Sequence, residues 1–299
     1  MAVSPSVPKA ACHARSNSLP ARSHPIASSF EGHLCRLRTS EASSSSSASS
    51  LIDQLGCLKG LHEQLQDLIQ LPSTQRTLSY EKSGADKVLN GSLRLLDVCG
   101  TARDVFLQTK ESIQELESSL RRKRGQTSLS HDVGTYLKSR KTVIKKVSKC
   151  INDLKSSEKH CPSVLIDEDS DLVAILEMLR EVEIVSFSVL KSALSYMSGT
   201  KSISKQISWS FATKFMQPKR ISSDAEGKTN EHEVKKIDGA LYALTIQKSC
   251  EGTRTEAVQD LQKQLQTFER VIQELEEGLE PIFSCLLKTR VSLLNVLSQ

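Results

Sequence analysis

Apolar residues spaced seven apart near the end of the chain constrain the fold more than any other feature. One series is Val258, Leu265, Ile272, Leu279, Leu286 and Leu293, and a second series, Leu261, Phe268, Leu275 and Ile282, is interleaved with it. This spacing places all of these side chains on one face of a long helix. The flanking positions include Gln262, Gln264, Val271 and Gly278 instead of regularly paired charges. We therefore expect the seam to pack within one chain, as in an antiparallel bundle, and not as a partner-selecting zipper.

Pro281 lies inside this seam. Proline has no N–H to donate to the carbonyl of Glu277, so it predicts a kink or a short break in the helix. The heptad register continues across it, so we expect both halves to pack on one core.

The rest of the chain also has helical periodicity, over about 51–71, 85–124, 129–157 and 167–197 and again from 234. Only 4% of the residues are aromatic, so leucine, valine and isoleucine must form the core, which suits helices packed on helices. The predicted fold class is all-α, a multi-helix bundle with long antiparallel helices and a disordered N-terminal arm. The bundle domain is predicted over 51–299, with an irregular polar insert at about 199–233.

Three local signals refine this prediction. Ser50 is expected to cap the first helix of the bundle, and Pro72 is expected to end it. The segment 184–190, IVSFSVL, is apolar or small on every side, so its helix is predicted to be the most buried.

Residues 1–50 are rich in Ser, Pro, Ala and Arg, and such a composition predicts a disordered arm. A short helical turn is possible at 33–38. Within the arm, Arg15 precedes Ser18 by three positions and Pro20 follows it by two. Phosphorylation of Ser18 would give it the charge and acceptor oxygens that a phosphoserine-reading protein of the 14-3-3 type binds.

The same arm suggests two alternative locations for the protein. No secretory h-region follows the start, so we expect a cytoplasmic protein. The arm has no acidic residue before Glu31, and an acid-poor, Ser- and Arg-rich composition is also typical of a chloroplast transit peptide.

A basic segment follows in the middle of the chain, where Lys138, Lys141, Lys145 and Lys149 share one helical face. A basic amphipathic helix of this kind can bind an anionic membrane surface, calmodulin or nucleic acid. Its lysines can equally face acidic helices of the bundle or remain solvated. Nucleic acid is not the expected partner, because no aromatic residues are interleaved to stack on bases.

The segment 201–220 combines apolar and basic residues. Ile203, Ile207, Phe211 and Phe215 fall four apart, and Trp209 lies among them. This pattern can form an interfacial helix for a membrane or a partner groove, or a flap over the bundle itself.

Motifs for catalysis, metals or cofactors are not found in the sequence. His62 opens HEQLQ, but Gln66 stands where a zinc protease carries its second histidine. The eight cysteines have no metal-clip spacing. The sequence therefore predicts no enzyme, no metal and no cofactor.

Several segments resemble the plant DUF241 family, which is related to the plant BYPASS proteins. They are RSNSLPARSHP, HLCRLRTSEASSSSS, LHEQLQDLIQLPSTQRTLS and the ending LEPIFSCLLKTRVSLLNVLS. The resemblance implies an all-helical, plant-specific protein tied to root and shoot development, without established catalytic residues. We therefore expect a non-enzymatic interaction or regulatory protein with protein partners. The alternative is a peripheral membrane protein that uses the basic helix and the aromatic segment.

Overall fold

In the computed structural model, the described residues are 25–42, 47–80, 82–122, 129–158, 170–199, 233–246 and 251–298. All the secondary-structure elements in these ranges are α-helices, so the predicted fold class is confirmed. The helices are α1 (Pro25–Ala42), α2 (Ala48–Gln70), α3 (Pro72–Tyr80), α4 (Lys82–Arg122), α5 (Leu129–Glu158), α6 (Ser170–Ser198), α7 (Glu233–Ile246) and α8 (Glu251–Leu297).

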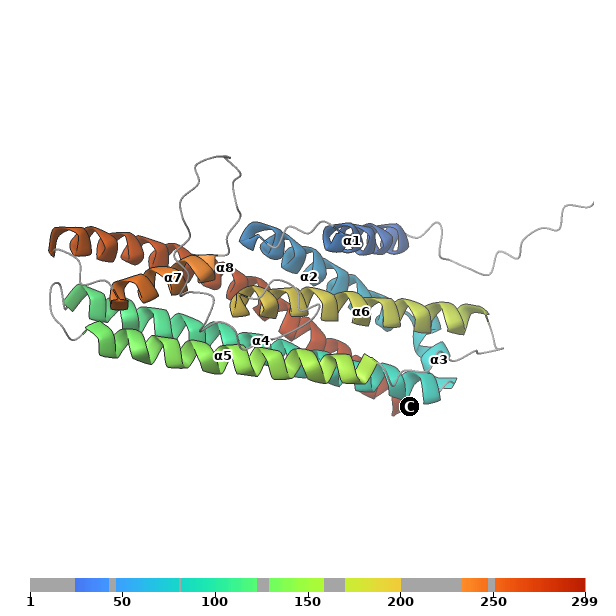
Figure 1. The fold of residues 1–299 in the computed structure, drawn as a ribbon. Coiled ribbons are helices and arrows are strands. Elements are labelled where there is room, and N and C mark those ends of the chain that lie inside the picture. The colour runs from blue at the N-terminus through green and yellow to red at the C-terminus, as the bar shows by residue number, and fades with distance from the viewer. Residues whose placement is uncertain are drawn as a thin grey trace, which may run out of the picture.

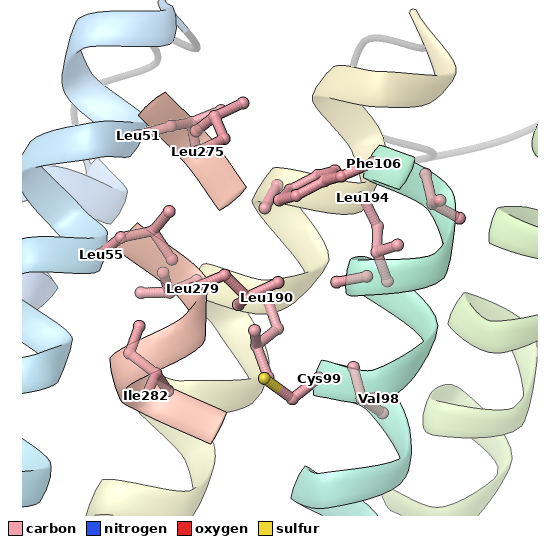
Figure 2. Close-up of a cluster of buried hydrophobic side chains, with 14 of the residues drawn as sticks. Leu51, Leu55, Val98, Cys99, Phe106, Leu190, Leu194, Leu275, Leu279 and Ile282 are labelled. Carbon is pink, nitrogen blue, oxygen red and sulfur yellow. The ribbon is translucent and has the colours of Figure 1, made fainter. Parts of the chain in front are cut away.

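Four helices surround the main core. Figure 2 shows side chains of α2, α4, α6 and α8 converging there, among them Leu55, Phe106, Leu190 and Leu279. Helices α4 and α6 run in one direction, and α2 and α8 run in the other (Figure 1). The remaining helices lie around this core, with α5 on α4, α7 on α8 and α1 on α2 (Figure 1).

The heptad seam is the inner face of α8, as the sequence predicts. All of its members are buried except Val258, which is partly buried and packs against the core. The buried members are Leu261, Leu265, Phe268, Ile272, Leu275, Leu279, Ile282, Leu286 and Leu293.

Helix α8 continues through Pro281 without interruption. The predicted alternative of a short break is therefore wrong. Leu279 and Ile282 on either side of the proline are fully buried. Their packing against the other core helices stabilises helical geometry at a position that has lost one backbone hydrogen bond.

The first helix of the bundle begins differently from the prediction but ends before Pro72, as predicted. Ser47, and not Ser50, caps α2, because the Ser47 hydroxyl oxygen accepts the backbone N–H of Ser50 at 3.2 Å. Pro72 does follow the end of α2, but it is also the first residue of α3. Proline suits a first helical position because the N–H that it lacks has no partner there.

For part of the N-terminal arm, the prediction of disorder is wrong. Residues 25–42 form α1, which buries Phe30, Leu34 and Leu37. Three apolar side chains at helical spacing give this segment enough apolar surface to dock, although its overall composition is polar. The predicted short turn at 33–38 lies within this longer helix.

Candidate functional site

The four lysines singled out in the sequence lie on the outer face of α5. Lys138, Lys141, Lys145 and Lys149 are all exposed. Spacings of three, four and four residues place them on one side of the helix, and 11 residues of rise make a stripe about 16 Å long. We call this set the lysine stripe.

The opposite face of α5 fixes the orientation of this stripe. Val133, Tyr136, Val143, Val147 and Ile151 are buried, and α5 packs against α4, α6 and α7. Because the apolar side chains are used in the core, the lysines point away from the bundle. Figure 1 shows α5 along an outer edge of the molecule.

Other charged side chains of the bundle form ion pairs between helices. Lys146, next to the stripe, reaches Asp104 of α4 at 2.7 Å, and Lys110 of α4 reaches Glu276 of α8 at 2.8 Å. Within the part of the chain that the structure describes, no carboxylate lies at ion-pair distance from the stripe lysines. The lysines could face acidic helices of the bundle or remain solvated, and the structure places them in solvent.

A shallow hollow of about 390 Å³ lies between α4 and α5 beside the stripe. Lys149 and Lys146 line it together with Asp97 and Asp153. Charges of both signs in an open hollow do not favour a strong site for one small ion. The extended outer face, and not this hollow, is the distinctive feature of α5.

A second polar arrangement lies between α5, α6 and α7. The guanidinium of Arg140 is almost fully buried, donates from Nη1 to the carbonyl of Met197 at 2.6 Å, and places Nε 3.5 Å from Asp238. Burial raises the pKa of the Asp238 carboxyl, while Arg140 acts in the opposite direction. Burial also raises the pKa of the Tyr136 hydroxyl, which has no hydrogen-bond partner among the described residues. This arrangement anchors the C-terminal end of α6, where Gly199 adopts φ +69°.

The sequence contained a signal for Arg140 that the prediction did not use. Arg140 occupies the same helical face as Val133, Tyr136, Val143 and Val147. A charged residue in an otherwise apolar stripe indicates a buried ion pair or a buried carbonyl partner.

His62 is a buried core residue that links α2 to α6. Its Nε2 lies 2.9 Å from the hydroxyl oxygen of Ser186, and that hydroxyl donates to the carbonyl of Val182 at 2.6 Å. Nε2 is therefore the protonated nitrogen, and Nδ1 has no partner among the described residues. Burial lowers the pKa of His62 to about 4, so the ring is neutral at pH 7. Among the described residues, no group of His, Cys, Asp and Glu could hold a metal ion.

The other sites predicted from sequence lie outside the described residues. These are the docking motif, made up of Arg15, Ser18 and Pro20, and the aromatic segment, made up of Ile203, Ile207, Trp209, Phe211 and Phe215. Both remain predictions.

The structure also exposes an apolar stripe that the sequence reading missed. Leu287, Val291 and Leu294 of α8 are exposed by 44%, 55% and 41%. Their spacing places them on the side of α8 away from the heptad seam. The sequence signal for this stripe was that the last turns of α8 carry apolar residues outside the seam positions.

Comparison with known proteins identifies a family. A family model described as Protein BPS1 matches residues 54–296. No curated protein and no solved structure matches the chain. In the ranges that the structure describes, no helix has the length and apolar character needed to span a membrane. Because the match extends from α2 almost to the end of α8, the chain belongs to the BPS1 family, the plant DUF241 family that the sequence resembles.

Proposed function

We propose that the protein is a non-enzymatic interaction protein that acts in plant root and shoot development through its outer surface. The observation that carries this proposal is the lysine stripe of α5. Four exposed cations on one face, without carboxylates at ion-pair distance among the described residues, form a surface complementary to an acidic partner.

The expected partner is a protein with an acidic face. Charges on an open surface contribute modestly one by one, but four together steer association and set its orientation. Binding should therefore weaken as salt increases, because ionic screening acts over about 8 Å at physiological ionic strength.

The test compares two variants that lose the same charge. The stripe variant replaces Lys138, Lys141, Lys145 and Lys149 with Gln. The control variant replaces the exposed Lys87, Lys236, Lys263 and Lys288 with Gln, so that both variants fall from +5 to +1.

The measurement is quantitative mass spectrometry of the proteins that copurify from root and shoot tissue. We expect the stripe variant to lose its main partners about tenfold or more and the control to keep them. Equal recovery with wild type and both variants would count against the stripe as the docking surface.

A second candidate function is attachment to an anionic membrane by the same lysines. The apolar face of α5 is buried in the bundle, so α5 cannot also insert into a bilayer as an interfacial amphipathic helix. Attachment would be electrostatic, at about 1 kcal/mol for each lysine near the surface.

Sedimentation with phosphatidylserine vesicles tests this membrane attachment. We expect binding at low salt that is lost at high salt and in the stripe variant, but not in the control. Wild type that stays in the supernatant at low salt excludes this function.

The N-terminal arm supplies a further proposed contact. Phosphorylated Ser18, with Arg15 and Pro20, would bind a phosphoserine reader, and the Ser18→Ala variant would lose it. Intact-mass measurement of the protein from plant cells separates this proposal from a transit peptide. Phosphate on a full-length chain supports a cytoplasmic docking arm, and a mature chain that starts after residue 25 supports a chloroplast location.

A further inference from the structure

Helix α1 contacts the bundle through a small set of apolar side chains. Phe30, Leu34 and Leu37 follow one another at i, i+4 and i+7, and all three are buried. Most of the side chains between them are exposed, including Cys35. This is the pattern by which a short amphipathic helix lies in a groove of another protein.

The groove has features that fit this helix. Gly60 of α2 leaves room for the ring of His33, because a Cβ on Gly60 would stand 2.7 Å from Nε2 of that histidine. The thiol of Cys57 donates to the carbonyl of His33 at 3.6 Å. Gln54 donates to the hydroxyl of Ser40 at 2.6 Å.

The other wall of the groove is α6, which adds a charge. Glu181 of α6 pairs with Arg38 of α1. Arg38 directly follows the third apolar anchor, Leu37. The carboxylate of Glu181 therefore lies beside the position that Leu37 occupies.

Helix α1 joins the hydrophobic core through three of its described side chains, Phe30, Leu34 and Leu37. Helices α2, α4, α6 and α8 supply the side chains that converge in Figure 2, and the family match begins at residue 54, beyond α1. With three buried anchors on a helix of 18 residues, α1 has little buried apolar surface to offset the entropy of ordering it, so we expect it to dock weakly.

We propose that the groove between α2 and α6 is a docking site for an amphipathic helix and that α1 is its displaceable resident. The matching partner is a helix with large apolar residues at i, i+4 and i+7, followed by a basic residue that reaches Glu181. The site is separate from the lysine stripe, so the two proposals stand or fall independently.

The test uses full-length protein and a fluorescent peptide with the sequence of residues 25–42. In the triple variant Phe30→Ser, Leu34→Ser, Leu37→Ser, α1 should leave the groove. We expect this variant to keep a cooperative thermal transition and to bind the peptide at least about tenfold more tightly than wild type, whose groove is occupied. A peptide with the same three substitutions is the matched control and should not bind.

The Arg38–Glu181 ion pair is tested by reversing its charges. Glu181→Lys in the triple variant should weaken binding of the peptide a few-fold, and an Arg38→Glu peptide should restore it. A folded triple variant that does not bind the peptide overturns the proposal, and so does a triple variant that unfolds.

Hydrogen exchange on the wild-type protein gives a second measurement that needs no substitution. We expect amides of α1 to exchange faster than those of α2 and α8, by local opening. Exchange of α1 only together with the core would show that α1 is an integral part of the bundle, and would overturn the proposal.

Discussion

Two neighbouring leucines of α8 provide a direct test of the fold. Leu286 belongs to the heptad seam and is 1% exposed, whereas Leu287 belongs to the outer apolar stripe and is 44% exposed. The substitutions Leu286→Ala and Leu287→Ala remove the same atoms from adjacent positions of one helix. Both substitutions change helix propensity by the same amount, so any difference in stability between the two variants reports the burial of the leucine side chain.

The expected costs follow from this difference in burial. Deleting a fully buried leucine side chain costs about 2–5 kcal/mol, which combines lost transfer free energy with the cavity that remains. Leu287 already has nearly half of its surface in water, so its deletion should cost about 1 kcal/mol or less. A protein of this size shifts its Tm by about 2–4 °C per kcal/mol. Leu286→Ala should therefore lower Tm by about 4 °C or more, and Leu287→Ala by about 4 °C at most.

The assay is urea unfolding followed by circular dichroism at 222 nm, with a thermal melt in parallel. An unchanged m-value would show that both variants unfold to the same extent as wild type. If Leu287→Ala destabilised the protein as much as Leu286→Ala, the outer stripe would be covered in solution and the exposed face described above would be wrong. If neither substitution had an effect, the seam would not be the core.

Three further predictions concern buried polar groups and glycines. The pKa of His62 is about 4 in the fold and about 6.5 when unfolded. The unfolded state therefore binds more protons between these values, and stability falls as pH drops through this window, by up to about 3 kcal/mol. Urea titrations at pH 7 and pH 4.5 should show that His62→Gln loses less stability between these two pH values than wild type does. Arg140→Met should cost about 1–3 kcal/mol in urea titration because it leaves the Met197 carbonyl without its donor and Asp238 without its ion-pair partner, and Lys141→Met at the exposed neighbouring position should be nearly neutral; equal effects would contradict the buried position of Arg140. Gly199→Ala should cost about 1–2 kcal/mol because φ is +69°, whereas Gly239→Ala inside α7, where a Cβ meets nothing within 4 Å, should raise the unfolding midpoint; opposite signs are the result to look for.

The sequence predicted those features that depend on spacing along one helix. The heptad positions of α8 became its buried face, and the helical periodicity over 167–197 became α6. At Pro281 the predicted alternative of a short break was wrong, because a local rule considers only the hydrogen bond lost at that residue. Burial of Leu279 and Ile282 in the core acts over a longer range and keeps α8 continuous.

Individual exposures were harder to predict. The apolar segment 184–190 predicted that its helix would be the most buried, yet Ile184 is 57% exposed. Helix α1 was missed because composition over fifty residues conceals three well-spaced anchors. The apolar stripe formed by Leu287, Val291 and Leu294 was missed because the stronger seam on the same helix accounted for its amphipathicity.

The sequence alone determined that the chain is helical, which face of each long helix is apolar, and that four lysines share one side of α5. These properties follow from the 3.6-residue period, which depends only on the order of residues. The tertiary structure decided what each face meets. It placed the lysine stripe in solvent because the apolar side of α5 is used against α4, α6 and α7. It also buried Arg140 against the end of α6 and seated α1 in the groove between α2 and α6. A periodic pattern shows which residues point together, but only the packing of other helices decides whether they point into the core or into water.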